Sequence, residues 1–249
     1  MKYFYEKALK PFILKEKYRD ICEIGAAGGE NTDLLAGLEN VTVTVVDPCH
    51  DADLTSKYAK NKKISVYKRK SLDALRELNQ AFDCFLIDGD HNWYTVFNEL
   101  KAIEEKSLLK AGGTIFLHDV RWPYARRDMY YLPEDIPESY RHPYARKGME
   151  RGRKDLSDSG GMNANHYNAL YEGGERNGVL TAVEDFLKIH GRKYYFFCYN
   201  RGEGLGVLIK KKSERTFFVF LVWFLKLKLR YYERKESVRK RLPPRFYPL

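Results

Sequence analysis

Short apolar runs alternate with segments of helical character between residues 20 and 117, and this alternation constrains the fold more than any other feature of the chain. Every position from Val41 to Val46 is β-branched, which is typical of a strand buried on both faces of a parallel sheet. The other runs have the length of single strands and fall at 20–25, 64–67, 82–87 and 114–117. Together they predict an α/β fold with a Rossmann-like, doubly wound and mostly parallel sheet.

Helical patterns occupy the intervals between these strands, at 30–38, 53–60 and 71–79 and from Trp93 onward. Gly112 and Gly113 are expected to stop the last of these helices. The pattern resumes near the end of the chain with a helix at 179–190 and two strands at 194–199 and 205–210. A glycine-containing turn separates those two strands, so we expect a C-terminal antiparallel hairpin that completes a seven-stranded sheet.

Three segments depart from the alternation. Residues 1–19 predict an N-terminal amphipathic helix, interrupted near Pro11. Residues 120–177, inside a central domain of residues 20–212, are rich in Pro, Arg, Tyr, Gly and Asn and lack periodicity. Because a loop of this length is usually functional, we expect this insertion to be an ordered substrate lid. Residues 213–249 form a basic amphipathic tail.

Polar residues gather where the predicted strands end. Glu23 and Gly25 end the first strand, Asp47 the second and Asp88 the fourth, and His118-Asp119 follow the fifth. Because the carboxyl ends of parallel strands share one edge of the sheet, these residues should lie together. The sequence therefore predicts a ligand site at this edge.

The first strand leads into a glycine-rich turn, Glu23-Ile-Gly-Ala-Ala-Gly-Gly, which opens the first helix. Glycines at such a turn let the backbone approach a ligand and leave helix N–H groups pointing toward it. Ala27 stands where the dinucleotide-binding fingerprint has its second glycine. Asp47, at the end of the next strand, is placed to hold the hydroxyls of a ribose. A Rossmann domain that binds another nucleotide is the alternative.

Three carboxylates and two imidazoles follow the fourth and fifth strands, in Asp88-Gly-Asp-His91 and His118-Asp119. Carboxylate oxygens and imidazole nitrogens suit a hard or borderline divalent cation. A cation there would lower the pKa of a substrate hydroxyl, and a nearby base would remove its proton. The alternative is that these residues only cap helices and bond to the backbone.

The turn and Asp47 resemble motif I and the following acidic residue of class I S-adenosylmethionine-dependent methyltransferases. The resemblance implies that Gly25 and Gly28 line the methionine part of the cofactor, that Glu23 lies near its amino group and that Asp47 holds the ribose. Further along the chain, it places Ser71 and Asp73 near the adenine and counts Asp88 among the cofactor-binding residues.

The Asp88 and Asp119 segments resemble the macrocin O-methyltransferase and cephalosporin-hydroxylase-like group, which is associated with glycan biosynthesis. The resemblance implies S-adenosylmethionine and Mg²⁺ or another divalent cation, held by Asp88, Asp119 and His118. His118 departs from the group, which has an acid there. By the same resemblance His91 is the catalytic base, and Asp90 is the competing base.

The likeness continues through the insertion to Ile209 and implies a sugar or glycolipid substrate. Aromatic faces can stack on sugar C–H surfaces, arginines can bind phosphate or carboxylate, and amides can bond to hydroxyls. The candidate substrate residues are Trp122, Tyr124, Arg126, Arg127, Asn163, His166, Asn168 and Glu172. For each of them, packing within the loop or on the surface is the alternative.

The net charge of +10 belongs to the tail, because the residues from Lys210 onward hold thirteen Lys and Arg against three Glu. Its apolar run, Phe217–Leu225, is too short to span a membrane, which takes about twenty residues. A helix lying on a membrane surface, a homo-oligomer helix and a helix packed on the domain all fit this pattern. Nucleic acid is disfavoured, since the aromatics form one block.

The rest of the composition bears on the compartment. The four cysteines have no paired spacing and predict reduced thiols, and the N-terminus lacks the apolar region of a signal peptide. We therefore expect a cytoplasmic protein, peripheral at the inner face of a membrane if the tail binds lipid.

Three functions are consistent with these features. The first is a metal-assisted O-methyltransferase that acts on a sugar hydroxyl of a glycan or glycolipid. The second is a non-haem iron hydroxylase that uses His91, His118 and Asp119, for which the glycine-rich turn would have no purpose. The third is a non-catalytic module that binds S-adenosylmethionine.

Overall fold

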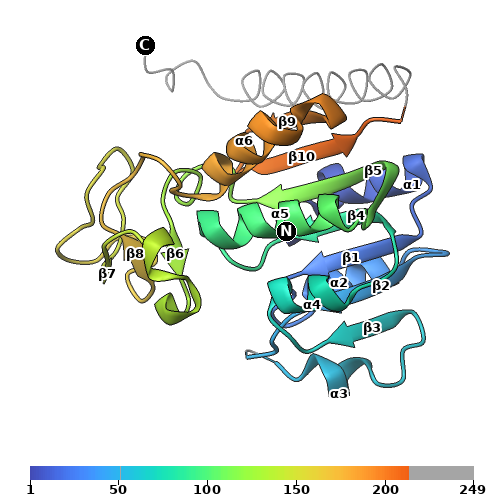
Figure 1. Ribbon diagram of the computed structural model, residues 1–249. Coiled ribbons are helices and arrows are strands. Elements are labelled where there is room, and N and C mark those ends of the chain that lie inside the picture. Colours follow the sequence, from blue (N-terminus) through green and yellow to red (C-terminus); the bar gives the residue numbers. More distant parts are fainter. Residues whose placement is uncertain (51, 213–249) are drawn as a thin grey trace, which may run out of the picture. The chain divides into compact units, whose positions relative to one another are not determined.

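Seven strands form one sheet in the order β3-β2-β1-β4-β5-β10-β9 in the computed structural model, which describes residues 1–50 and 52–212 (Figure 1). The strands are β1 (Asp20–Ile24), β2 (Thr42–Val46), β3 (Ile64–Tyr67), β4 (Phe82–Ile87), β5 (Leu109–His118), β9 (Tyr194–Tyr199) and β10 (Leu205–Lys210). The first five pair in parallel, and β10 runs antiparallel to β5 and β9. The predicted Rossmann-like sheet with its C-terminal antiparallel hairpin is confirmed.

Helices cover both faces of this sheet. They are α1 (Lys10–Glu16), α2 (Glu30–Ala36), α3 (Leu54–Tyr58), α4 (Ser71–Glu77), α5 (Trp93–Glu105) and α6 (Val179–His190). Alternation along β5 shows the two faces: the Phe116 ring packs edge-on against Phe12 of α1, whereas Ile115 and Leu117 join the core formed with α4, α5 and α6. The sheet is therefore buried on both sides, as its apolar strands require.

The first segment of the chain is helical throughout but is not one regular α-helix. A 3₁₀ turn (Lys2–Phe4) and a π-helix (Tyr5–Leu9) precede α1. Pro11 lies in the first turn of α1, where its missing N–H breaks no hydrogen bond. The irregularity expected near Pro11 therefore takes the form of a change in helix type, and the helix ends at Lys17, which adopts a left-handed conformation with φ 57°.

Gly112 and Gly113 do not end the helix that begins at Trp93, so this prediction was wrong. The helix ends at Glu105, and Ser107 adopts a left-handed conformation with φ 54°. Both glycines lie inside β5, beside a register irregularity between β4 and β5. A side chain at Gly113 would place its Cβ 2.8 Å from the Asp83 carbonyl oxygen, so close approach of the two strands explains the glycine.

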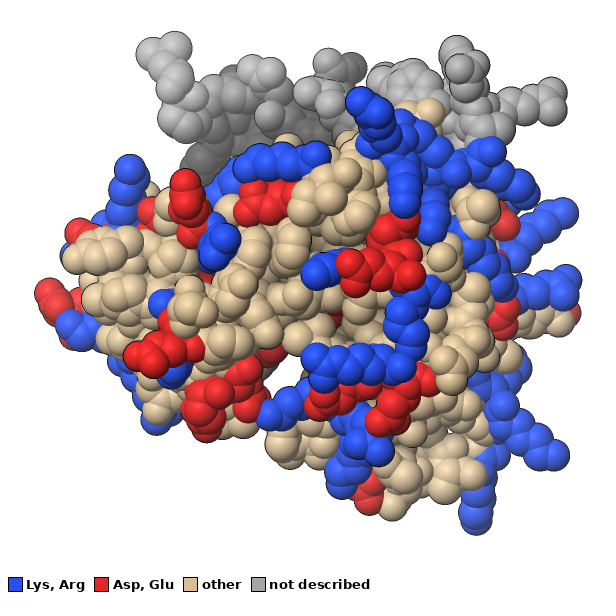
Figure 2. All heavy atoms as spheres, in the orientation of Figure 1, with Lys and Arg blue, Asp and Glu red and all other residues tan. Residues whose placement is uncertain are grey.

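The insertion at residues 120–177 is folded. It forms a second, three-stranded antiparallel sheet in the order β6-β8-β7, from β6 (Met129–Tyr130), β7 (Tyr144–Arg146) and β8 (Tyr167–Ala169), with two 3₁₀ turns (Pro133–Asp135 and Glu138–Tyr140). Figure 2 shows a hollow between the insertion and the part of the domain around β3 and α3. An ion pair between Lys70 and Asp135 links the two sides.

Residues Met1–Lys210 form one compact unit. The predicted tail at 213–249 lies outside the described residues. Among the residues that the structure does describe, no helix combines the length and the apolar character needed to cross a membrane.

Glu99 of α5 is a charged group in the core. Its side chain is fully buried, and neither carboxylate oxygen has a hydrogen-bond partner of good geometry among the described residues. Burial raises the pKa of Glu99 to about 8, against an opposing contribution from the Ser71 hydroxyl. The folded protein therefore keeps Glu99 protonated at neutral pH, whereas the unfolded chain releases that proton near its ordinary pKa of 4.5.

Glu99→Gln should remove a pH-dependent cost of folding. Between pH 4.5 and about 8, ionisation of Glu99 in the unfolded chain alone should lower the free energy of unfolding by up to about 1.4 kcal/mol per pH unit. Chemical denaturation from pH 5 to 9 should show this slope in the wild type and a shallower one in Glu99→Gln. The exposed Glu105→Gln on the same helix is the control, and equal slopes for all three proteins would contradict the assignment.

Candidate functional site

The predicted site residues meet at the carboxyl edge of the parallel strands. In the sheet register Ile24 lies beside both Val46 and Ile87, and Ile87 lies beside Leu117. The residues that follow these strand ends are therefore neighbours, although they come from four distant segments of the chain. This confirms the expectation that the strand ends share one edge of the sheet.

Gly25 is the residue on which the glycine-rich turn depends. Its φ is +81°, and a Cβ built on it would lie 2.4 Å from the Cα of Gly89, in the loop after β4. The loops after β1 and β4 thus cross in direct backbone contact, which excludes any side chain at this position. Gly28 lies in the same turn, where its carbonyl accepts a hydrogen bond from Lys57.

Asp47 holds the turn in shape. Its carboxylate accepts hydrogen bonds from the backbone N–H groups of Ala26 at 2.8 Å, Ala27 at 3.1 Å and Cys49 at 2.6 Å. Each carboxylate oxygen can accept more than one hydrogen bond, so these contacts leave capacity for a ribose hydroxyl. The ribose contact stays a prediction, and the structure adds a role in fixing the turn that the sequence did not suggest.

Glu23 lies beneath the turn and is buried. Its carboxylate accepts hydrogen bonds from the Asn31 amide at 2.7 Å and the Thr32 hydroxyl at 2.5 Å, both on α2. Burial raises the pKa of Glu23 to about 7, although these two bonds favour the charged form. In this geometry the carboxylate binds the start of α2 to the end of β1.

The two residues predicted near the adenine lie at the start of α4 and differ in exposure. Ser71 is half-buried and faces Glu99, whereas Asp73 is exposed and pairs with Arg76 at 3.0 Å. Asp73 lies in the first turn of α4, where its negative charge stabilises the helix.

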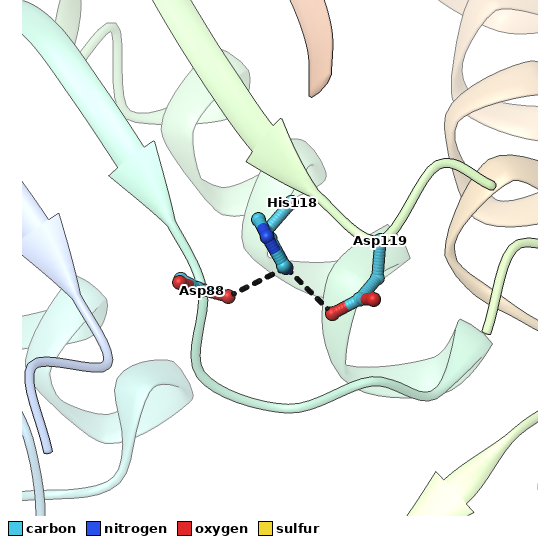
Figure 3. A group of neighbouring side chains, drawn as sticks. All are labelled: Asp88, His118 and Asp119. Carbon is cyan, nitrogen blue, oxygen red and sulfur yellow. Dashed lines mark hydrogen bonds and ion pairs between the residues drawn. The ribbon is translucent and has the colours of Figure 1, made fainter. Parts of the chain in front are cut away.

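Asp88, His118 and Asp119 converge, as Figure 3 shows. The Nδ1 atom of His118 lies 2.8 Å from Oδ2 of Asp119 and 3.2 Å from Oδ1 of Asp88. Consecutive residues of a strand point to opposite faces, but β5 ends at His118, and Asp119 adopts a left-handed conformation with φ 58°. This single backbone change brings both side chains to the same place.

The donor set of this cluster fits a divalent cation. One ligand atom from each residue can be chosen so that all three lie within 4.8 Å of one another. Ligands about 2.0–2.2 Å from a central ion would lie roughly 3 Å apart, close to the two distances above. Two carboxylates with one imidazole suit a borderline ion such as Mn²⁺ or Zn²⁺ as well as Mg²⁺.

His91 is held by the same carboxylate. Its Nδ1 lies 2.9 Å from Oδ2 of Asp119, and its ring stacks on Tyr124 with centroids 5.3 Å apart. Burial disfavours the charged imidazolium, but the charge of Asp119, its hydrogen bond to His91 and the charges of Asp88 and Asp90 together outweigh burial and raise the pKa of His91 to about 9. Although burial opposes it, the two histidines hold the pKa of Asp119 well below its usual range.

Asp90, the competing base, points elsewhere. Its Oδ2 accepts a hydrogen bond from the Thr95 hydroxyl at 2.9 Å, so it is tied to the first turn of α5. Burial raises the pKa of Asp90. The geometry therefore favours His91 as the base, because His91 has an orienting carboxylate on one nitrogen and Nε2 on the other side of its ring.

Some of the predicted substrate residues gather around His91. Tyr124 covers its ring, and the Asn163 amide donates to the Tyr124 hydroxyl at 2.7 Å. The His166 ring lies edge-on to Tyr131, with centroids 5.7 Å apart. Trp122 is half-buried and carries the Arg151 guanidinium over its ring at 4.7 Å.

The other candidate substrate residues hold the insertion together. Arg126 forms a two-point ion pair with Glu184 of α6, with both distances 2.6 Å. Arg127 is fully buried and donates to the carbonyls of Ala169 and Lys154. Both guanidinium groups thus bond within the protein and support the fold of the insertion, although the buried Nε of Arg127 has no hydrogen-bond partner among the described residues.

Asn168 and Glu172 also interact with other residues of the insertion. The Asn168 side chain is buried, and its amide donates to backbone carbonyls at residues 147, 163 and 166. The half-buried Glu172 contributes negative charge near the Arg127 guanidinium. Both therefore support the insertion from within.

Sequence reasoning missed the first segment of the chain as a neighbour of the site, whereas Tyr131 is one of the aromatic residues of the insertion that are expected to stack on a sugar. The first segment of the chain reaches the cluster, because the Met1 amino group lies 2.5 Å from Oδ2 of Asp88 and the Phe4 ring lies 5.7 Å from that of His118. The Tyr131 hydroxyl lies 3.4 Å from Nε2 of His91. No local pattern marks Met1 or Phe4, since both reach the site through tertiary packing.

Comparison with known proteins gives a match of residues 22–120 to the family model of a methyltransferase domain. No curated protein sequence matches the chain. Among solved structures, a Klebsiella pneumoniae protein provisionally assigned as an O-methyltransferase has 14% identity and a TM-score of 0.50, covering 82% of this chain and 79% of its own. This similarity concerns the fold alone.

Two further solved structures have TM-scores just below this value. A Staphylococcus aureus protein provisionally assigned as a caffeoyl-CoA O-methyltransferase has 17% identity and a TM-score of 0.49, covering 81% of this chain and 80% of its own. An O-methyltransferase from Bacillus cereus, solved in complex with SAH, has 16% identity and a TM-score of 0.48, covering 82% of this chain and 80% of its own.

The family match spans β1 to β5, which are the strands that position the glycine-rich turn and the acid–histidine cluster. The segment from β1 to β5 therefore matches a methyltransferase domain, and it lies on a Rossmann-like sheet.

Gly25→Ala should weaken cofactor binding by at least about tenfold, because the new Cβ would collide with Gly89 and displace the turn. Calorimetric titration with S-adenosylmethionine measures the dissociation constant directly. Gly152→Ala is a matched control, since Gly152 also has a positive φ, of +89°, but no atom within 4 Å of the added Cβ. Wild-type affinity in Gly25→Ala would contradict the placement of the cofactor at this turn.

Proposed function

We propose that the protein transfers a methyl group from S-adenosylmethionine to a sugar hydroxyl of a glycan or glycolipid. The observation that carries this proposal is the position of His91, which is oriented by Asp119 at the same edge of the sheet as the glycine-rich turn. A base beside the methyl donor suits an acceptor that must lose a proton, as a hydroxyl does.

The chain's own residues account for the steps of such a transfer. The turn around Gly25 and the Asp47 carboxylate hold the donor, and His91 takes the proton of the acceptor hydroxyl at Nε2. Asp119 keeps the opposite nitrogen, Nδ1, bonded, so that the ring keeps its orientation and the imidazolium is stabilised once it forms. The hydroxyl oxygen then attacks the methyl group, and neutral S-adenosylhomocysteine leaves.

A sugar fits the surroundings of His91 better than an anion does. The half-exposed ring of Tyr131 lies beside His91 and is available for stacking, and Asn163 and His166 supply hydrogen-bonding groups next to Tyr124 and Tyr131. The two arginines that would have bound a phosphate are occupied inside the insertion. Attachment to a membrane through residues 213–249, or assembly into an oligomer through them, remains a prediction from the sequence.

We include a divalent cation at Asp88, His118 and Asp119 in this proposal, because the donor set fits one. Bound there, the cation would lower the pKa of the acceptor hydroxyl. Asp119 would then interact with both the cation and His91. Because it would stabilise the imidazolium less, the pKa of His91 would be lower. The match of residues 22–120 to a methyltransferase domain disfavours the alternative of an iron hydroxylase built on the same residues.

Without added metal, the residual methyl transfer should rise with pH and level off near pH 9, because the neutral form of His91 is the base and the pKa of His91 is about 9. Below that pH the rate should fall by about tenfold per unit. The measurement is transfer of labelled methyl groups to a panel of oligosaccharides, with the methylated position read by mass spectrometry. His91→Gln should lose at least about a hundredfold in kcat and bind the donor normally.

Two controls complete this test. Treatment with EDTA should lower the rate, and Mn²⁺ or Mg²⁺ should restore it and move the pH inflection downward. His190→Gln, at the far end of α6, should behave like the wild type. Donor binding without transfer to any acceptor would favour a non-catalytic module, and a pH profile unchanged in His91→Gln would remove His91 as the base.

A further inference from the structure

The imidazole of His91 is enclosed on three sides by described side chains. Asp119 lies at Nδ1 at 2.9 Å, Tyr124 stacks on the ring at 5.3 Å, and the Tyr131 hydroxyl lies 3.4 Å from Nε2. Nε2 is the nitrogen that an acceptor hydroxyl has to reach. The group that meets it in this structure is therefore a hydroxyl of the protein itself.

Tyr131 differs from the other two neighbours in exposure. Its relative exposure is 50%, whereas Tyr124 and Asp119 are each 4% exposed. Of the three, Tyr131 alone can move into solvent without opening the core. Its backbone is nevertheless held near His91, because the N–H of Met129 in β6, two residues earlier, donates to the His91 carbonyl at 3.1 Å. The backbone near Tyr131 is therefore anchored beside His91.

The contact between Tyr131 and His91 is long for a hydrogen bond, since such bonds usually measure about 2.7–3.2 Å. Within residues 1–50 and 52–212, the Tyr131 hydroxyl makes no hydrogen bond other than this one. A weak bond to a half-exposed ring is displaced at small cost. Nε2 has one site for a hydrogen-bond partner, so Tyr131 and an acceptor hydroxyl exclude each other there.

We propose that the Tyr131 hydroxyl is a gate over Nε2 of His91, and that an acceptor must displace it before its own hydroxyl can be methylated. The inference rests on the proposed role of His91 as the base. It adds a residue that selects the acceptor: a substrate has to supply both a hydroxyl at Nε2 and enough contact with the displaced ring to keep it away. Water meets the first condition and not the second.

Reaction of His91 with diethyl pyrocarbonate tests the gate without any methyl transfer. The reagent modifies accessible imidazole nitrogens, and peptide mass spectrometry gives a separate rate for each histidine. Tyr131→Phe removes only the hydroxyl and should raise the rate at His91 by about two- to tenfold, as expected for loss of one weak hydrogen bond. Tyr131→Ala should raise it further, and His50, which is exposed, is the internal reference in every sample.

Tyr171→Phe is the matched control, since Tyr171 is an exposed tyrosine of the same insertion, with 63% of its surface accessible. Its His91 rate should equal that of the wild type. Equal His91 rates in the wild type, Tyr131→Phe and Tyr131→Ala would overturn the gate. A faster reaction in the variants supports the gate even if no acceptor is found, so the two proposals fail independently.

Where an acceptor is available, Tyr131→Phe should lower its KM by about two- to tenfold with kcat unchanged or raised, because the acceptor no longer competes with the hydroxyl. A fall in kcat with an unchanged KM would instead assign Tyr131 to proton transfer and would contradict the gate.

Discussion

The Asp119 carboxylate organises the site. It is buried and accepts hydrogen bonds from His118 at 2.8 Å and His91 at 2.9 Å. It reaches both rings because the backbone turns into a left-handed conformation directly after β5. A non-glycine residue in that conformation costs about 1–3 kcal/mol, and the two contacts to histidine offset it. Without this turn, Asp119 and His118 would face opposite sides of the sheet.

A second buried carboxylate holds the insertion over the site. Asp128 accepts hydrogen bonds from the N–H groups of Trp93 at 2.7 Å and Gly178 at 2.6 Å, at the starts of α5 and α6. Burial raises the pKa of Asp128 to about 6, although these bonds favour its charged form. Asp128 therefore fixes the insertion to the starts of α5 and α6. Tyr124 and Tyr131 of the insertion lie beside His91.

The architecture was predictable from sequence because it depends on local patterns. Runs of β-branched residues mark buried strands, and the seven strands and their parallel and antiparallel pairing followed from those runs. The edge that carries the site followed as well, because parallel strands bring their carboxyl ends together. Two features of the architecture were not predicted: the position of Gly112 and Gly113, where close approach of two strands and not a helix end explains the glycines, and the small sheet of the insertion.

The details of the site were less predictable, because they arise from tertiary contacts. The turn at Asp119, the Met1 and Tyr131 contacts and the engagement of Asp47 with the turn involve residues distant in the chain or a single backbone angle. The same holds for Arg126 and Arg127, whose charge suggested an anionic ligand, although Arg126 pairs with Glu184 and Arg127 donates to two backbone carbonyls. The sequence shows that a loop residue is charged, but it does not show which group that residue pairs with.

The central claim is that the glycine-rich turn and His91 serve one reaction. A crystal structure of the protein with bound S-adenosylhomocysteine tests this most directly. We expect a ligand whose ribose contacts Asp47, whose methionine part follows the turn at Gly25, and whose sulfur faces the space beside Nε2 of His91. A ligand bound elsewhere, or one whose sulfur faces away from His91, would contradict this claim.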